Sequence, residues 1–278
     1  VAIFEVLSIG KHKQIQGAGG RMLLLMPGDI VMAAFGTRYA TSQFEGYLPQ
    51  TCAQEFDILG AGGTIGVVKS MHVKFNQTGT TRLRIIGYAV KDGVVVNTIQ
   101  QKAELVKRFE GTIPAKVILS VGSSMDSGKT TTAAHLVYGL KAMNKKVAFV
   151  KLTGTVYTKD IDMVYDMGAD MVADFSDFGY PSTFLCKETE LLDLYASLIH
   201  TVQSIAPDYI VVEIADGLYQ RETAMLLRNP LFAQSVYGTV FSAGDSLSAV
   251  NGYQVLRAWG VLPFAISGLF TASPLMIE

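Results

Sequence analysis

The sequence is poor in cysteine, histidine, tryptophan and charge. Its 278 residues include two cysteines, four histidines and one tryptophan, and 17% of the residues are charged. Cys52 and Cys186 stand far apart, without a CxxC pair or a neighbouring histidine, which argues against a disulfide framework and against a zinc site. A reducing compartment is the default for such a chain, so we expect a cytoplasmic protein.

Neither sign of charge is in excess, because the chain has 23 basic and 24 acidic residues and a formal net charge of -1. No run of lysine or arginine marks a surface for nucleic acid or for an anionic membrane. Residues 258–277 are uncharged over the length of a membrane span, about 20 residues, but glycine and proline interrupt them. We therefore expect a small-molecule substrate, and neither nucleic acid nor a membrane as a partner.

The first hundred residues consist of short apolar or alternating runs between turn signals. The strands predicted from these runs are residues 21–26, 29–35, 64–75, 82–90 and 94–99. Short strands at this spacing predict a small barrel or sandwich. Residues 100–110 are charged and predict a helix, which Gly111 and Pro114 end. We therefore expect a β-rich domain at residues 1–111 and a second domain at residues 112–278.

From residue 116 onward, apolar strands alternate with helices. The predicted strands are residues 116–121, 147–152, 209–214, 238–241 and 263–269, and the predicted helices are residues 130–143, 191–205 and 246–259. Continuous apolar strands separated by helices are typical of a parallel sheet covered on both faces, which predicts a doubly wound α/β domain. Ligands of such sheets bind at the carboxyl ends of the strands.

The segment after the first of these strands reads GSSMDSGKT, and we interpret it as a P-loop between an apolar strand and a helix. Glycines let backbone N–H groups face phosphates, Lys129 reaches the outer phosphates, and the Thr130 hydroxyl can ligate Mg²⁺. We therefore expect ATP or GTP to bind here with Mg²⁺. The residues expected to hold the nucleotide are Gly122, Ser123, Ser124, Met125, Asp126, Ser127, Gly128, Lys129, Thr130 and Thr131.

Two further strand ends carry charged residues. One reads KLTGT from Lys151, the other VEIADG with Glu213, and the run KDID at residues 159–162 opens a helix between them. A lysine near a transferring phosphoryl group would neutralise developing charge, and a carboxylate beside Thr130 would complete a magnesium shell. The alternative is that Lys151 and Glu213 form an ion pair at the rim of the sheet.

These segments resemble, in the same order, the motifs of dethiobiotin synthetase and its relatives among the P-loop ATPases. That family has a GTDT(D/E)VGKT loop, a strand ending KPV(A/Q)(S/T)G, an Asp-Ala-Leu segment, an NPYTF run and a strand ending VEGAGG. This chain has GSSMDSGKT, KLTGT, DMV, YPSTF and VEIADG. The resemblance covers residues 116–274 and leaves the N-terminal domain unexplained.

The resemblance implies an ATP-dependent, Mg²⁺-requiring ligase or phosphoryl-transfer enzyme that activates a small carboxylate or carbamate as an acyl phosphate. It also implies a homodimer. By position, the catalytic residues would be Lys129, Lys151 and Thr155, of which the last two would meet the carbamate and the transferred phosphoryl group. The magnesium site would consist of Thr130, Asp162 and Glu213.

The chain also departs from that family. The loop has Ser123, Ser124 and Met125 where the family has Thr-Asp-Thr, and no adenine-reading asparagine follows the last strand. The substrate, the choice between ATP and GTP and the question of whether the chain is truncated at either end stay open.

Two alternative functions remain. The first is a non-catalytic nucleotide-binding regulator or assembly factor. The second is an acyl-CoA-dependent enzyme resembling P-loop N-acyltransferases of D-amino acids, although Thr130, where that family has methionine, favours a nucleotide.

Overall fold

The computed structural model describes residues 1–278, and the chain divides into two compact units. The first unit comprises residues 1–105 together with 155–158 and 175–185, and the second comprises residues 106–154, 159–174 and 186–278. The first change of unit therefore falls a few residues before the division expected at residues 111 and 112. Two short segments from the second half of the chain also group with the first unit, and no sequence pattern signals this.

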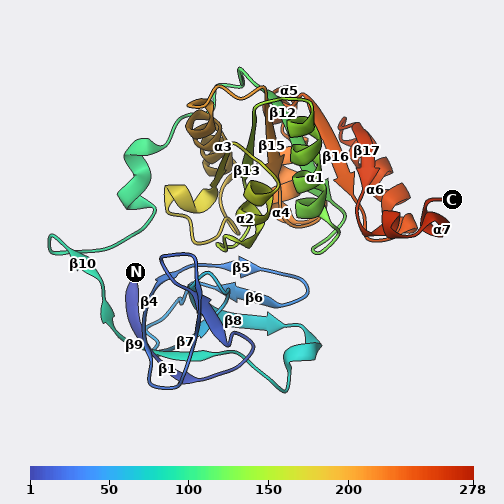
Figure 1. Cartoon of the computed structure of the whole chain (residues 1–278). Coiled ribbons are helices and arrows are strands. Elements are labelled where there is room, and N and C mark those ends of the chain that lie inside the picture. The colour runs from blue at the N-terminus through green and yellow to red at the C-terminus, as the bar shows by residue number, and fades with distance from the viewer. The chain divides into compact units, whose positions relative to one another are not determined.

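The first unit is a small β-barrel (Figure 1). Its sheet has the order β4-β1-β9-β7-β8-β6-β5, and β4 also pairs in parallel with β8 through Ala34 with Thr64 and Phe35 with Ile65. This pairing closes the barrel and leaves β6 and β5 as an extension, which confirms the predicted barrel-like domain. The strands are β1 (Ala2–Ser8), β4 (Ile30–Phe35), β5 (Arg38–Tyr39), β6 (Phe44–Tyr47), β7 (Glu55–Ile58), β8 (Thr64–Met71) and β9 (Arg82–Tyr88).

The barrel interior is filled by alternate residues of its strands. In β1, Ala2, Phe4 and Val6 are buried and the residues between them are half-buried, as the two-residue period of a strand requires. Phe4 makes edge-to-face ring contacts with Phe35 at 5.4 Å and with Phe56 at 6.0 Å between ring centroids. The sequence analysis missed β1 and β7, although both contribute to this core.

Three predictions for the first half are wrong in detail. The strand predicted to run to residue 75 ends at Met71, and a 3-10 turn, η1 (Val73–Phe75), follows it. The strand predicted at residues 94–99 shortens to β11 (Val94–Val95), which pairs only with β10 (Val90–Lys91) in a separate hairpin. The helix predicted at residues 100–110 is a 3-10 segment, η2 (Gln100–Leu105).

A second hairpin in the first unit consists of β2 (Gln14–Gln16) and β3 (Met22–Leu24).

The second unit contains a six-stranded sheet in the order β14-β13-β15-β12-β16-β17. Every neighbouring pair in it is parallel, which confirms the predicted α/β architecture; the sequence analysis missed only β14. The strands are β12 (Lys116–Gly122), β13 (Val147–Lys151), β14 (Met171–Asp174), β15 (Tyr209–Glu213), β16 (Gly238–Ser242) and β17 (Pro263–Ser267).

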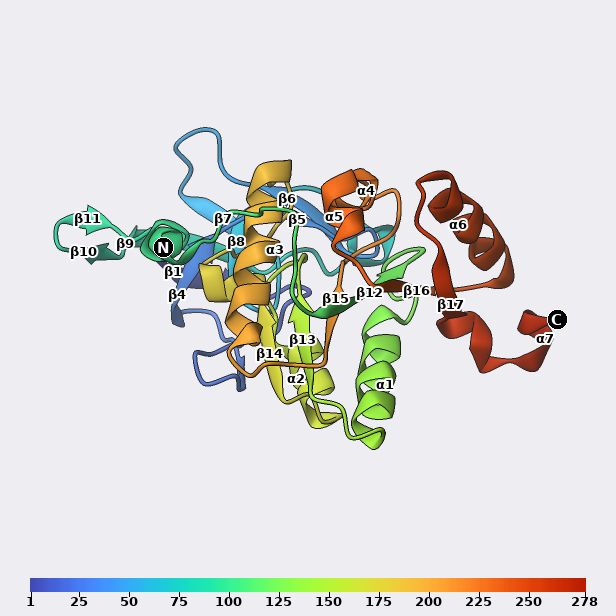
Figure 2. The same cartoon turned by 90° about the horizontal axis from the view of Figure 1, so that it is seen from above.

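Helices cover both faces of this sheet (Figure 2). On one face lie α1 (Lys129–Ala142) and α2 (Lys159–Asp166), and on the other lie α3 (Glu188–Gln203), α4 (Arg221–Arg228) and α6 (Ser246–Ala258). The remaining short elements are η3 (Phe175–Phe178), α5 (Pro230–Gln234), η4 (Leu269–Ala272) and α7 (Pro274–Ile277). No helix in the chain has both the length and the apolar character needed to cross a bilayer.

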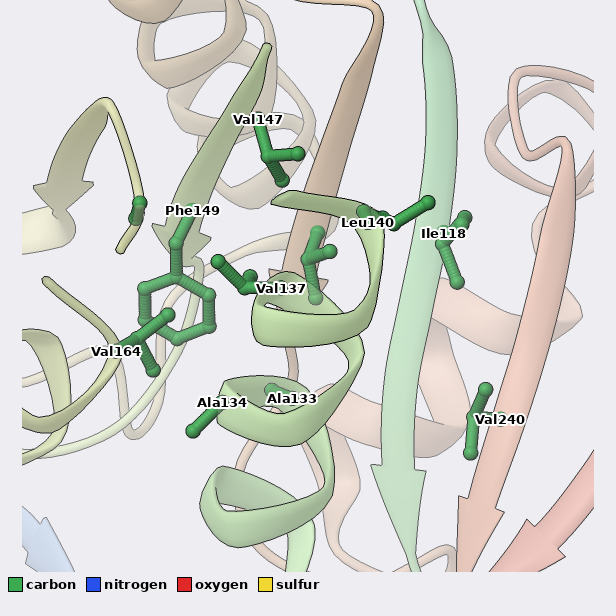
Figure 3. Packing of buried hydrophobic residues seen from close by; sticks show 11 residues of the cluster. Ile118, Ala133, Ala134, Val137, Leu140, Val147, Phe149, Val164 and Val240 are labelled. Carbon is green, nitrogen blue, oxygen red and sulfur yellow. The ribbon is translucent and has the colours of Figure 1, made fainter. Parts of the chain in front are cut away.

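Buried apolar side chains of α1 and of the sheet form one core cluster (Figure 3). Ala133 and Val137 of α1 pack with Phe149 of β13 and Val211 of β15 in one buried cluster. Residues two further along each strand point to the same face. Lys151 therefore follows Phe149, and Glu213 follows Val211, on the α1 side of the sheet at the carboxyl ends of the strands.

Candidate nucleotide-phosphate site

The loop between β12 and α1 requires glycine at both of its ends. A Cβ atom on Gly122 would lie 2.3 Å from Ser127 Oγ, and Gly128 has a φ of 99°, which strongly favours glycine. The P-loop pattern places four residues between its two glycines, whereas five separate these two. The strict pattern is therefore not met, and the loop has instead the length of the dethiobiotin synthetase loop that it resembles.

Lys129 is the first residue of α1, and its side chain folds back to contact this loop. Its side chain is 6% exposed, and its Nζ donates a hydrogen bond to the carbonyl oxygen of Ser124 at 2.8 Å. Burial lowers the pKa of Lys129, and the carboxylates of Glu213 and Asp216 partly oppose this effect. The loop therefore holds a buried cation whose hydrogen bond goes to a neutral carbonyl, within electrostatic range of three carboxylates, those of Glu213, Asp216 and Asp126.

Buried polar atoms without a hydrogen-bond partner gather around this lysine. They are Ser123 Oγ and Ser127 Oγ in the loop and Glu213 Oε2 at the end of β15. A buried polar atom without a partner costs about 1–3 kcal/mol, so such atoms at one place indicate a ligand that would satisfy them. Phosphate oxygens would accept from the two hydroxyls and from Lys129, and a divalent cation would suit the free carboxylate oxygen.

The loops after β15 and β17 approach the phosphate loop so closely that neither can carry a side chain there. A Cβ atom on Gly217 would lie 2.4 Å from the carbonyl oxygen of Ser123, and one on Gly268 would lie 2.4 Å from that of Ser127. The backbone N–H of Leu269 donates to the same Ser127 oxygen at 3.2 Å. The sequence analysis did not identify either glycine as part of the site, although each follows an apolar strand.

Lys151 and Glu213 are both buried, at 6% and 2% exposure. Their Nζ and Oε1 atoms lie 3.9 Å apart, so the ion pair considered as an alternative is present. The closer partner of Lys151 is Asp160 of α2, a residue that was not among the candidates. Because Glu213 Oε2 has no partner, this pairing leaves one carboxylate oxygen for a further ligand.

The other predicted site residues lie in different surroundings. Thr130 is half-buried in the first turn of α1, while Thr131 and Asp162 are exposed. Thr155 belongs to the first unit, whereas Lys151 belongs to the second, and Thr155 forms an isolated antiparallel bridge with Ser182. The chain contains no group of three or more His, Cys, Asp and Glu side chains placed to hold a metal.

Two carboxylates in this region were not predicted as site residues. Asp160 pairs with Lys151, and Asp216 acts on the charge of Lys129. Both stand in strings that the sequence analysis quoted, KDID and VEIADG. Only the folded chain distinguishes Asp160 from Asp162, because residues two positions apart in the first turn of α2 lie on nearly opposite sides of the helix.

Comparison with known proteins gave no family profile and no characterised sequence that matches the chain. Among solved structures, the signal recognition particle receptor FtsY from Elizabethkingia anophelis is 15% identical with a TM-score of 0.37, over 61% of this chain and 55% of that one. The kinase domain of the Escherichia coli tyrosine kinase ETK is 19% identical with a TM-score of 0.40, over 56% of this chain and 68% of that one. The chain thus spans about half the length of the receptor.

A third similar structure is the 54 kDa protein of the signal recognition particle from Aeropyrum pernix in complex with GDP. It is 18% identical with a TM-score of 0.34, over 46% of this chain and 28% of that one. The geometry of the second unit itself combines a parallel sheet, a loop bounded by Gly122 and Gly128 and a buried lysine at the start of a helix. This combination is the geometry of a P-loop fold.

Proposed function

We propose that the second unit binds a nucleoside triphosphate with Mg²⁺ and transfers its outer phosphoryl group to a small carboxylate or carbamate. The observation that carries this proposal is the buried Lys129 beside the unsatisfied oxygens of Ser123, Ser127 and Glu213. The dethiobiotin synthetase resemblance supplies the acceptor class, and ATP is the expected nucleotide, with GTP as the other possibility.

In this proposal the loop residues bind and orient the phosphates. Lys129 would exchange its neutral acceptor, the Ser124 carbonyl oxygen, for anionic phosphate oxygens, which form stronger hydrogen bonds. Thr130 and Glu213 would be protein ligands of Mg²⁺, which usually keeps phosphate oxygens and waters as its other ligands. The bound nucleotide and metal supply the transferable phosphoryl group and neutralise its charge.

Lys151 would act on the transferred group. It is buried at the end of β13, where Asp160 and Glu213 hold its ammonium group. A fixed cation at this edge stabilises charge that develops on the phosphoryl oxygens. The resemblance alone supports a metal-binding role for Asp162, a substrate-binding role for Thr155 and a homodimer. A monomer mass by light scattering at micromolar concentration would exclude the homodimer.

Phosphate release measured with and without small carboxylic acids and amines tests the reaction. We expect Lys151→Ala to lower kcat by at least about tenfold while the Kd for ATP changes little, because this lysine acts mainly in the transition state. Glu213→Gln should raise the Mg²⁺ concentration needed for half-maximal rate. The matched control is Lys145→Ala, which removes an exposed lysine and should change neither quantity.

The same measurements distinguish a nucleotide-dependent regulator. One observation favours that function: the chain passes from the second unit to the first after Gly154, three residues beyond Lys151, and again after Asp174. Slow hydrolysis that no acid or amine accelerates, together with unchanged turnover in Lys151→Ala, would support the regulator and exclude the phosphoryl transferase.

A further inference from the structure

The turn between β7 and β8 of the barrel is rich in glycine, and two of its glycines lie against a segment from the second half of the chain. Gly63 has a φ of 90°, whereas Gly60 and Gly62 have no positive φ that would require glycine. A Cβ atom on Gly60 would lie 3.1 Å from Thr155 Cγ2, and one on Gly62 would collide with the carbonyl oxygen of Val156. The turn is therefore shaped to accommodate residues 155–156.

Gln16 of β2 binds the other end of the same segment. Its Nε2 donates to Thr158 Oγ1 at 2.7 Å, and its Oε1 accepts from the backbone N–H of Thr158 at 3.2 Å. The backbone N–H of Gln16 donates to the carbonyl oxygen of Ala61 at 2.7 Å. One side chain, attached to the glycine turn through its own backbone, thus fixes both the position and the orientation of Thr158.

Segment 155–158 is also held on a second side. Thr155 forms its antiparallel bridge with Ser182, and the backbone N–H of Val156 donates to the carbonyl oxygen of Pro181 at 3.0 Å. The same oxygen accepts from Oγ1 of the buried Thr64, the first residue of β8, at 3.1 Å. Contacts within the first unit therefore fix the segment from two directions.

This segment is the middle of the loop that joins β13 to α2. Lys151 is the last residue of β13, and Asp160 is the second residue of α2. The two side chains pair within the second unit, while the chain leaves that unit after Gly154 and returns to it at Lys159. Because so short a loop has few free dihedral angles, a shift of its middle is transmitted to its ends.

We propose that Gln16 and Gly62 are positioning residues for phosphoryl transfer, which hold segment 155–158 so that Asp160 keeps Lys151 in its reactive place. The inference rests on the proposed function and gives the barrel a role in it. Both residues act through the pair of Lys151 and Asp160 and not on the reacting atoms. A cation that is fixed before the reaction stabilises developing charge without the cost of reorganisation.

Gln16→Ala removes both bonds to the side chain and backbone of Thr158 and provides the first test. A small misplacement of a group that acts in the transition state slows the reaction strongly, so kcat should fall by at least about tenfold while the Kd for ATP stays unchanged. Gln16→Glu keeps an oxygen for the N–H of Thr158 and should retain most of the rate. Gln14→Ala, at an exposed glutamine of the same strand, is the matched control.

A double variant tests whether Gln16 acts through Lys151. When Lys151 is already alanine, Gln16→Ala should lower kcat by less than about twofold further, because the group that it positions is gone. A further tenfold fall would overturn the proposal, since the two residues would then act independently.

Gly62→Ala tests the same role from the glycine turn. The added methyl group would displace Val156, so we expect faster hydrogen exchange of residues 155–158 and again a fall in kcat of at least about tenfold. Gly19→Ala, where a Cβ atom would meet open space, should change neither quantity. Circular dichroism checks that each variant is folded.

The outcomes separate this inference from the proposed reaction. Wild-type protein that turns over no small carboxylate or amine would refute the reaction and, with it, the inference. Wild-type turnover that neither Gln16→Ala nor Gly62→Ala slows would refute the inference alone. A rise in the Kd for ATP that parallels the fall in kcat would also overturn it, because general structural damage affects both quantities.

Discussion

The strands of the two units are buried in different ways. All five residues of β13 are buried, and in β12 every residue except Lys116 is buried, whereas β1 alternates between buried and half-buried residues. A sheet covered on both faces excludes polar residues along most of each strand, so a charged residue at a strand end, such as Lys151 or Glu213, is conspicuous in the sequence. In the barrel, strands such as β9 mix polar and apolar residues along their length, so a functional polar side chain is not conspicuous.

Two lysines, one in each unit, illustrate the difference. Burial lowers the pKa of both Lys129 and Lys11. Lys129 belongs to a loop motif and starts a helix, whereas Lys11 lies in an irregular segment between β1 and β2 and meets Gln43 and Arg38 only through the fold. A local motif therefore reveals one of these cations, and tertiary contacts alone reveal the other.

The largest expected effect on function is the loss of nucleotide binding in Lys129→Ala. A hydrogen bond to a charged group contributes about 1.5–3 kcal/mol, so the loss of two such bonds from Lys129 to phosphate oxygens should raise the Kd for ATP by at least about a hundredfold. Calorimetric titration measures the Kd, and circular dichroism checks that the fold is intact. Lys145→Ala, at an exposed lysine, is the control. An unchanged Kd for ATP in Lys129→Ala would mean that the loop motif does not mark a phosphate site. The contrast between Lys129, which a local motif reveals, and Lys11, which only tertiary contacts reveal, would then be lost.

Removal of one buried phenylalanine from each unit compares the two cores. Phe149 and Phe4 are both fully buried, and replacement of each by alanine should lower the free energy of unfolding by about 3–5 kcal/mol. Phe264→Ala, at a side chain that is 61% exposed, should cost less than about 0.5 kcal/mol. Denaturant titration gives all three values. A cost below about 1 kcal/mol for Phe4→Ala would show that the barrel interior is not a packed core.

Stability should depend on pH through His12 in the barrel. Its folded-state pKa of about 3 lies below the ordinary value of 6.5, so between these values the unfolded chain binds a proton that the folded chain does not. The free energy of unfolding should therefore fall as pH falls below about 6.5, by up to about 1.4 kcal/mol per pH unit.

Denaturant titrations at several pH values from about 7 to 4 measure this slope. His12→Gln should flatten it, whereas His135→Gln, at an exposed position on α1, should leave it unchanged. A slope that survives in His12→Gln would mean that other groups cause the acid sensitivity.

The smallest effects concern glycines, and they should differ in sign between the two units. Gly139 lies inside α1 with open space where a Cβ atom would be, so Gly139→Ala should raise the free energy of unfolding by up to about 1 kcal/mol. Gly63, in a barrel turn, has a φ of 90°, so Gly63→Ala should lower it by about 1–2 kcal/mol. Thermal unfolding of both variants measures the difference, and two changes of the same sign would refute it.

The sequence by itself determined most of the second unit. Apolar runs of strand length, the helical segments between them and the glycine-rich turn into α1 are local signals, so they predicted the parallel sheet and the place of the phosphate loop. The same signals placed Lys129 at the start of a helix and Lys151 and Glu213 at strand ends, where parallel strands bring ligand-binding residues together.

Only the tertiary structure decided the rest, because the contacts concerned join residues that are distant along the chain. The barrel closes where Ala34 pairs with Thr64, and no local pattern encodes that pairing. Residues 155–158 and 175–185 join the first unit, although they follow strands of the second. Lys11 and Gln43 stand 32 positions apart, and their contact depends on tertiary packing that a single strand or turn cannot specify.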